Sequence, residues 1–159
     1  MITGVLHSIN VSEGGVPKLP RPWAQVRVDG VEGDRQEDRR FHGGPDRAVS
    51  LYSLDLIEAL QGEGHSIVAG SIGENLTLHG IDWTAVRTDA RIEIGDVVLE
   101  VTRAASPCYK IAASFHDGVF ARVSQKVYPG WSRFYARVLR EGVVSTGDRV
   151  LLTAPQLLF

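Results

Sequence analysis

The sequence predicts a mainly β protein, a closed or partly closed β-barrel with a few short helices. Short aliphatic and β-branched stretches recur along the whole chain, and glycine-containing turns separate them. With 159 residues, 43% hydrophobic and 23% charged, the composition is typical of one globular domain with a substantial core. Many short strands with frequent glycine turns favour a barrel over a doubly wound α/β sheet. We expect one domain over residues 1–152, followed by a short tail over residues 153–159.

The first half of the chain predicts three strands and one helix. Residues 2–10 are expected to form the first strand, and residues 12–22, rich in glycine and proline, a loop without sheet pairing. Residues 24–28 alternate as a strand does and lead into a polar stretch over residues 30–45. Residues 48–52 predict a short apolar strand. Residues 54–61 have their aliphatic side chains at helical spacing, with Ser53 as N-cap and Gly62 as the stop.

The second half predicts further strands joined by tight turns. Residues 71–78 combine a turn and a strand. Residues 91–94 and 97–102 flank the dipeptide Gly95-Asp96, which predicts a hairpin. Residues 131–139 carry apolar side chains at spacings that fit a helix and a strand equally well, so the pattern does not distinguish the two. Residues 143–144 and 149–152 flank a second Gly-Asp turn at Gly147-Asp148.

Charge and composition exclude several classes of protein. The formal net charge is −2 and no dense basic run occurs, so neither nucleic acid nor a membrane surface is an expected partner. The N-terminal segment has no secretion-signal pattern, and no apolar run is long enough to span a bilayer. One cysteine cannot form an intramolecular disulfide, so a reducing cytoplasm is the expected compartment.

That single cysteine, Cys108, is the first candidate for chemistry. It lies directly after a predicted strand, in the segment from Arg103 to Lys110, and Pro107 before it ends sheet pairing. Neighbouring positive charge favours the reactive thiolate over the thiol in proteins generally. The alternative is a packing role, because free cysteine is among the most buried residue types.

Two glycine-bearing polar segments are further candidates. Residues 33–47 hold four arginines, His42 and a Gly-Gly-Pro turn, a combination suited to binding phosphate or carboxylate. The alternative is a solvated loop in which arginines and acids balance. Residues 70–76 place Glu74 and Asn75 after glycines, either to aim polar groups into a pocket or to form a tight turn.

Other catalytic patterns are missing from the sequence. There is no phosphate-binding P-loop, no dinucleotide-binding glycine motif and no Gly-x-Ser-x-Gly nucleophile elbow. The five histidines lack zinc-site spacing. A pairing of Cys108 with His42 would permit a thiol hydrolase, but the sequence does not place them together.

In their order, three segments resemble the signature of MOSC domains, named after the C-terminal part of molybdenum cofactor sulfurases. The segments are GDRQEDRRFHGGPDRAVSLY (33–52), GSIGENLTLHG (70–80) and SPCYK (106–110). The resemblance extends through GWSRFYARVLREGVVSTGDRV (130–150), and the chain is similar to short stand-alone bacterial members. It implies a barrel like that of the pyruvate kinase barrel domain.

The resemblance implies roles for specific residues. In the family, the cysteine matching Cys108 carries a persulfide or ligates molybdenum in a pterin cofactor, and both roles need a thiolate. The cofactor phosphate needs cations, for which Arg47, Arg103 and Lys110 are the candidates. Asp46 and Asn75 match polar positions near the metal or pterin. The matching loop residues His42, Gly43 and Gly44 are expected to shape the pocket.

Two functions follow from the resemblance. The first is a molybdenum-dependent oxidoreductase that reduces N-hydroxylated bases or related compounds, with Cys108 as metal ligand. Its electrons would come from a separate flavoprotein, because the sequence has no flavin or nicotinamide motif. The second is a sulfur carrier, with a persulfide on Cys108 supplied by a cysteine desulfurase. Pyridoxal phosphate binding is implied only at the level of the family, because in some proteins this domain is fused to a desulfurase that uses pyridoxal phosphate. The reductases that the chain resembles have an additional N-terminal β-barrel module that helps to hold the cofactor. This minimal domain is therefore expected to bind cofactor weakly, to use a partner, or to form a homodimer that completes the site.

Overall fold

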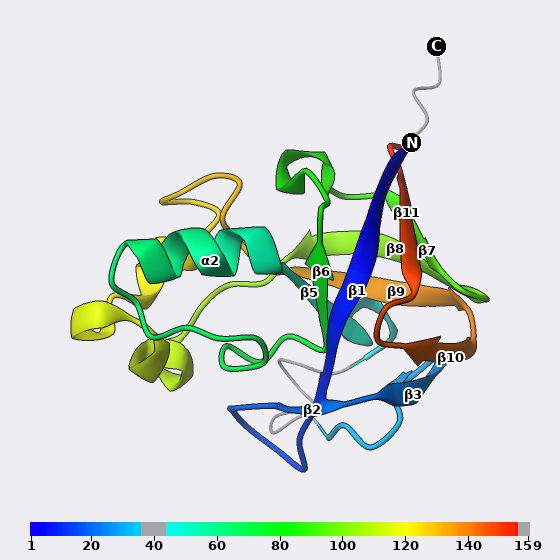
Figure 1. Cartoon of the computed structure of the whole chain (residues 1–159), viewed down its shortest axis with the longest axis horizontal. Coiled ribbons are helices and arrows are strands. Elements are labelled where there is room, and N and C mark those ends of the chain that lie inside the picture. The colour runs from blue at the N-terminus through cyan, green and yellow to red at the C-terminus, as the bar shows by residue number, and fades with distance from the viewer. Residues whose placement is uncertain (36–43, 156–159) are drawn as a thin grey trace.

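The mainly β architecture is confirmed. The computed structural model describes residues 1–35 and 44–155, and shows a barrel with short helices on one side (Figure 1). The strands are β1 (Ile2–Val11), β2 (Leu19–Arg21), β3 (Trp23–Arg27), β4 (Gly30–Val31), β5 (Val49–Ser53), β6 (Leu76–His79), β7 (Arg91–Ile94), β8 (Val97–Ala104), β9 (Phe134–Arg140), β10 (Gly142–Ser145) and β11 (Arg149–Thr153).

Seven of the described strands close into a ring in the order β1, β11, β7, β8, β9, β5, β6. The pairing of β1 with β11, from Ile2 opposite Leu152 to Val5 opposite Arg149, joins the first and last of them. Neighbours in the ring are antiparallel except β5 and β6, which run parallel. Closure removes the exposed edges that an open sheet would present.

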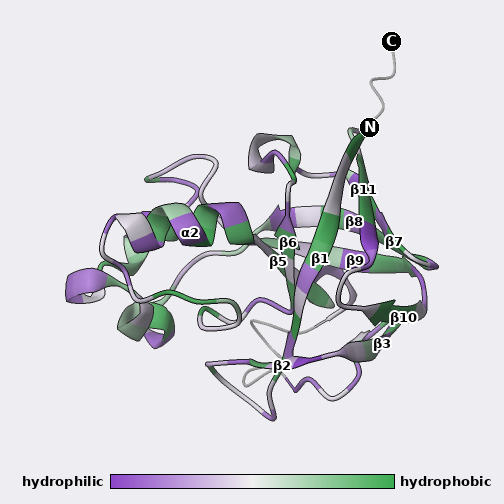
Figure 2. Cartoon of the chain, viewed as in Figure 1, coloured by the Kyte–Doolittle hydropathy of each residue, from purple (hydrophilic) through white to green (hydrophobic). Residues whose placement is uncertain are grey.

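The barrel interior is apolar because strand side chains alternate between inside and outside. In β7, Ile92 and Ile94 are fully buried, while Arg91 and Glu93 are exposed. The same alternation gives neighbouring residues of the strands contrasting hydropathy in Figure 2. The predicted hairpin of β7 and β8 is present, with Gly95 at φ 59° in its turn.

One sequence expectation about the strands was wrong. Residues 19–21 lie in the expected loop yet form β2, which pairs with the end of β1 and places Pro20 opposite Asn10. The pairing tolerates a proline because β2 is an edge strand whose second side forms no ladder. The predicted Gly147-Asp148 turn is present between β10 and β11, and these two strands do not pair with each other. β10 pairs with β3 in a second sheet of order β10-β3-β4.

The ambiguous stretch 131–139 contains β9, which begins at Phe134. The helix α2 (Leu54–Gly62) begins as expected, with the Ser53 side chain accepting a hydrogen bond from the Leu56 amide. Short 3-10 helices are η1 (Pro45–Arg47), η2 (Trp83–Ala85), η3 (Tyr109–Ser114), η4 (His116–Gly118) and η5 (Phe120–Val123). In Figure 1, α2 and the segment from η3 to η5 lie together beside the barrel.

No helix in the described ranges is long and apolar enough to cross a membrane. β11 continues to Thr153, and residues 156–159 of the expected tail lie outside the described residues. The division of the chain at residue 152 stays a prediction.

Candidate functional site

Cys108 lies where the chain leaves the barrel. β8 ends at Ala104, and the Ala105 amide still donates to the carbonyl oxygen of Arg133 at 2.9 Å. Cys108 then precedes η3 with an extended backbone, at φ −137° and ψ 173°. Its side chain is half-buried. The thiol is therefore neither sealed in the core nor fully exposed.

Cys108 lines an open pocket between the η3 segment and the barrel. The space available to the centres of water-sized molecules is about 90 Å³. Its walls are Gly15, Val16, Lys18, Arg35, Ser50, Ile72, Gly73, Ser106, Cys108, Lys110, Ile111, Arg133 and Tyr135. Four of these side chains are cationic, and none of the lining residues in the described ranges is an acid. Such a surface favours an anionic ligand next to the thiol.

Arg133 and Lys18 are the two nearly buried cations of the four, and Arg133 is the one without an acidic partner in the described residues. It is 9% exposed, and its Nη1 donates to the Ile72 carbonyl oxygen at 2.8 Å. Its Nε has no hydrogen-bond partner among the described residues. A buried guanidinium with an unused donor is costly unless a ligand completes its hydrogen bonds. Arg133 is therefore a candidate for binding an anion in the pocket.

Lys18, in contrast, is already paired. Its Nζ lies 2.7 Å from Asp34 Oδ2, and both side chains are nearly buried. Asp34 also accepts hydrogen bonds from the Ser12 amide and from Asn75 Nδ2, each at 2.9 Å. The lysine therefore fixes the pocket wall, and its charge is largely compensated.

Asn75 supports the pocket and does not line it. It is fully buried, and its Oδ1 accepts from the Ser50 amide at 3.0 Å and from Ser50 Oγ at 3.2 Å. Its Nδ2 donates to Asp34 and to the Asn10 carbonyl oxygen. Asn75 thus ties Ser50 of β5, which does line the pocket, to the turn before β6.

The η1 residues flank the site. Asp46 is exposed, and its Oδ1 lies 3.2 Å from Arg137 Nη2. Arg47 places its guanidinium carbon 5.7 Å from the centroid of the Tyr135 ring, a pocket residue. Gly44 begins η1 at φ 98°, with open space around it. None of the three lines the pocket itself.

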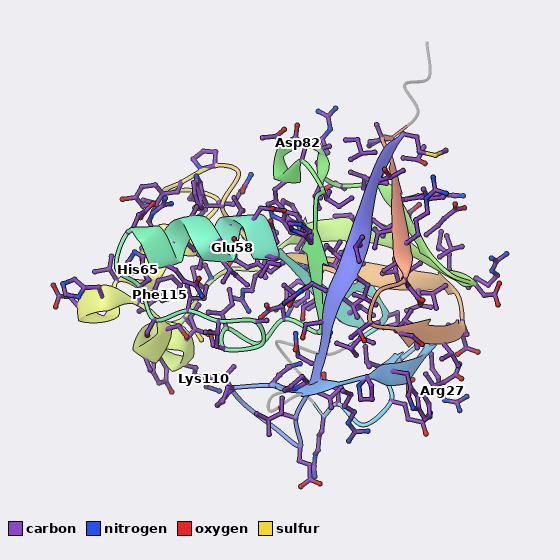
Figure 3. All side chains as sticks on the ribbon, in the orientation of Figure 1. Arg27, Glu58, His65, Asp82, Lys110 and Phe115 are labelled. Carbon is purple, nitrogen blue, oxygen red and sulfur yellow. The ribbon has the colours of Figure 1, made fainter. Side chains whose placement is uncertain are left out.

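The remaining predicted residues divide into three groups. Lys110 lines the pocket beside Cys108, and Figure 3 shows it on the η3 side of the molecule. Arg103 lies outside it, in a different depression with Trp83, Arg87 and Phe134. His42 and Gly43 lie outside the described residues. Within the described ranges, the structure thus brings Cys108 and Lys110 together and separates them from Arg103.

Sequence reasoning did not single out Arg133, Lys18 or Ser50. One signal for Arg133 was available in the sequence. It is the one charged residue in the largely apolar and aromatic stretch 131–136, where a buried charge needs an explanation. Lys18 lies in residues 12–22, for which the sequence predicts a loop. Arg35 was within the arginine-rich segment but was not distinguished from its neighbours.

The barrel and its pocket define a class of protein, a small β-barrel domain that presents one thiol beside several cations. The chain belongs to the MOSC domain family, whose domain matches residues 38–151. This confirms the family resemblance stated from the three motifs.

Three proteins are similar to this chain in sequence. The chain is 35% identical over 148 residues to YflK of Bacillus subtilis, covering 88% of this chain and 63% of YflK. It is 30% identical over 125 residues to YiiM of Escherichia coli, covering 70% and 56% of the two chains. A protein named "Reductase" from Gibberella moniliformis is 30% identical over 129 residues, covering 77% of this chain and 22% of that protein. The chain therefore spans less than two thirds of each relative.

Solved structures have the same fold. The crystal structure of YiiM from Geobacillus stearothermophilus superposes with a TM-score of 0.72 at 26% identity, covering 94% of this chain and 75% of that one. The YuaD protein of Bacillus subtilis superposes with a TM-score of 0.75 at 18% identity over 98% of both chains. At that identity, the second likeness concerns the fold alone.

Proposed function

We propose that this protein binds the molybdenum cofactor, with Cys108 as the metal ligand, and reduces N-hydroxylated bases or related small molecules. One observation carries the proposal. The single cysteine shares a pocket with Arg35, Lys110 and Arg133, and no acid lines that pocket among the described residues. MOSC membership and the relative named "Reductase" support the same reading.

The residues present fit the cofactor. A thiolate is the soft donor that a molybdenum ligand requires, and Cys108 is half-buried beside the cations. A phosphate needs hydrogen-bond donors with positive charge, and Arg133 and Lys110, which line the pocket, offer them. When bound, the cofactor would supply two-electron chemistry at its metal. Cys108 would hold the metal, and Arg133, Lys110 and Arg35 would hold anionic groups.

The other predicted residues would act around this centre. Arg47 would stiffen the Tyr135 wall through its contact with the ring. Asn75 would keep Ser50 in place, and Asp46 would tie η1 to Arg137. Arg103 would contact the cofactor only if the ligand extended beyond Ser106. Roles for His42, Gly43 and Gly44 stay predictions.

The overall reaction needs a separate reductant. Breaking the N–O bond of an N-hydroxylated base consumes two electrons and two protons and releases water and the amine. The electrons would come from a flavoprotein partner, as expected from the sequence. A homodimer that completes the site stays a prediction.

Metal and pterin analysis of protein purified from a cofactor-producing host tests the proposal. We expect molybdenum and pterin near stoichiometric amounts in the native protein and loss of molybdenum in Cys108→Ser. Ser106→Ala, which alters another residue of the same wall, serves as the matched control and should keep the metal. Native protein free of molybdenum and pterin would refute the proposal.

A sulfur-carrier role is the second candidate. The half-buried position of Cys108 leaves its sulfur accessible, and the neighbouring cations would stabilise a persulfide anion. Incubation with a cysteine desulfurase should then add one sulfur atom to Cys108, removable by dithiothreitol. Mass spectrometry of the native protein and of Cys108→Ser distinguishes this outcome from metal ligation.

A further inference from the structure

The walls of the Cys108 pocket carry positive charge. Four cationic side chains line the pocket, and none of its lining residues in the described ranges is an acid. Asp34, which does not line the pocket, pairs with one of the four, Lys18, at 2.7 Å. The charge that acts on a ligand beside the thiol therefore comes mainly from the other three cations.

Arg133 is an independent sign that the pocket takes a ligand. The residue is 9% exposed, and its guanidinium makes one hydrogen bond among the described residues, from Nη1 to the Ile72 carbonyl oxygen. The same nitrogen would lie 3.9 Å from a Cβ added to Gly73. Ile72 and Gly73 both line the pocket, so the guanidinium lies at the pocket wall. Because a guanidinium has several N–H donors, a nearly buried one with a single protein acceptor is suited to an anionic ligand.

The sulfur of Cys108 is reachable from the same space. Its side chain is half-buried, and the pocket is open, with about 90 Å³ available to the centres of water-sized molecules. A narrow arm that carries a carboxylate has room there beside the thiol. Cys108 is also the single cysteine of the chain, so no second thiol of the protein can resolve a disulfide formed on it. A mixed disulfide at Cys108 would persist until a thiol from solution removed it.

We propose that Cys108 exchanges with low-molecular-weight disulfides that bear carboxylates, and that the pocket cations select these over neutral and cationic disulfides. After releasing its proton to solvent, the Cys108 thiolate attacks one sulfur of the small disulfide. The S–S bond of that disulfide breaks, and a new S–S bond joins Cys108 to one half. The other half leaves as a thiolate and takes up a proton. Cys108 is oxidised and the leaving half is reduced, so the step needs no further oxidant.

The selection has two physical causes. A cleft lined by charge of one sign raises the local concentration of reagents of the opposite sign and lowers that of reagents of the same sign. Within the pocket, Arg133 and Lys110 would then hold the carboxylate of the half that stays, through charge-assisted hydrogen bonds.

The exchange goes beyond the proposed function, and only its consequence for the cofactor rests on that function. A sulfur held in a mixed disulfide is no longer a thiolate, which is the form that ligates metals. Carboxylate-bearing disulfides should therefore block molybdenum loading at Cys108 until a thiol releases the adduct.

Rates of adduct formation on the cofactor-free protein test the proposal. Intact-mass spectrometry follows the reaction with dithiodipropionate, hydroxyethyl disulfide and cystamine, which are anionic, neutral and cationic near neutral pH. Each rate is divided by the rate of the same reagent with N-acetylcysteine amide, a neutral thiol, to remove the intrinsic reactivity of the reagent. At low salt the normalised rates should fall in that order, by roughly 10- to 100-fold from first to last. The difference should shrink to a few-fold in about 1 M NaCl, where charges are screened within about 3 Å.

Variants locate the source of the preference. At low salt, Arg133→Gln and Lys110→Gln should each lower it by roughly fivefold, the effect of one unit charge about 4 Å away in water. Arg103→Gln is the matched control, because it makes the same kind of change at a cation outside the pocket, and it should keep the wild-type preference. Cys108→Ser should form no adduct. Lys110 is exposed, so its variant keeps the proposal testable if Arg133→Gln fails to fold.

Several results would overturn the proposal: no adduct on the wild type, equal normalised rates for the three reagents, a preference that salt does not reduce, or an unaltered preference in Lys110→Gln. None of these measurements needs molybdenum or turnover. A protein that binds no molybdenum but shows the charge preference would refute the proposed function and leave this inference standing. A protein that binds molybdenum, but whose cofactor-free form shows no preference, would do the reverse.

Discussion

Arg122 binds Glu63 through two parallel hydrogen bonds. Its Nε donates to Oε1 at 2.9 Å and its Nη2 to Oε2 at 2.8 Å. The guanidinium carbon also lies 4.0 Å from the centroid of the Trp131 ring and 4.5 Å from that of Tyr128. This contact ties η5 to the end of α2, and so fixes one end of the segment that follows Cys108.

Glu63→Gln should destabilise the protein in a pH-dependent manner. The hydrogen bond from Arg122 lowers the pKa of Glu63, so its contribution is present above the unfolded-state value of about 4.3 and is lost as pH falls through the folded-state pKa. Because the Glu63 side chain is 43% exposed, we expect Glu63→Gln to lower the free energy of unfolding by only about 0.5–1 kcal/mol at pH 7. Urea unfolding at several pH values measures it. The difference from wild type should shrink below about pH 4, whereas Glu58→Gln should show little effect at any pH.

Gly70→Ala should be strongly destabilising. A Cβ at Gly70 would lie 2.3 Å from the carbonyl oxygen of Lys18, and the backbone is at φ 83°. The backbone at Lys18, just before β2, would have to move to relieve this clash. We expect the free energy of unfolding to fall by roughly 3–5 kcal/mol. Gly44 has a similar φ of 98°, but a Cβ added there would meet no other atom. Gly44→Ala should therefore lower the free energy of unfolding by only about 1–2 kcal/mol. Chemical denaturation of both variants gives the comparison, and equal costs would show that the contact with Lys18 is unimportant.

Asp34→Asn should destabilise the fold more than Lys18→Met. Removing the carboxylate leaves a nearly buried lysine without its counter-ion, which costs about 3–5 kcal/mol. Lys18→Met leaves Asp34 with two hydrogen-bond donors, the Ser12 amide and Asn75 Nδ2. Free energies of unfolding at pH 7 test this order. The reverse order would mean that Asp34 is not stabilised by its remaining donors.

Lys110→Gln should lower cofactor retention, while Arg103→Gln should not. Lys110 lines the pocket with Cys108, and Arg103 lies in another depression. Loss of one charge-assisted contact should weaken retention by roughly tenfold, or about 1.4 kcal/mol. The measurement is the molybdenum content of each variant after dialysis. Metal loss in Arg103→Gln of the same size would instead place the cofactor phosphate beyond Ser106.

The sequence predicted those structural elements that depend on a few adjacent residues. Ser53 caps α2 as expected, and Gly95-Asp96 makes the expected hairpin turn, because both depend on adjacent residues. The edge strand β2 was missed, since Pro20 is tolerated only because of where the strand lies in the sheet. The parallel pairing of β5 with β6 also joins strands that the sequence separates by α2.

The site was predictable only where a motif was contiguous. Cys108 and Lys110 are neighbours in one motif and share one pocket. Arg103 belongs to the same predicted segment, but it precedes the end of β8 and lies in a different depression. Arg133 reaches the pocket because β9 pairs with β8, with Phe134 opposite Ala104, a relation that no local pattern contains.

The pairing of β1 with β11 brings the two ends of the barrel side by side. In Figure 1 the N-terminus lies at the top of the molecule beside β11, whereas Figure 3 places Lys110, a pocket residue, far from it at the lower left. A domain whose ends meet away from its pocket can be inserted between other segments of a longer polypeptide. The barrel need not open for this, and the pocket stays uncovered. Such an arrangement suits a module that recurs in proteins of very different length, such as the Gibberella relative, of which this chain covers 22%.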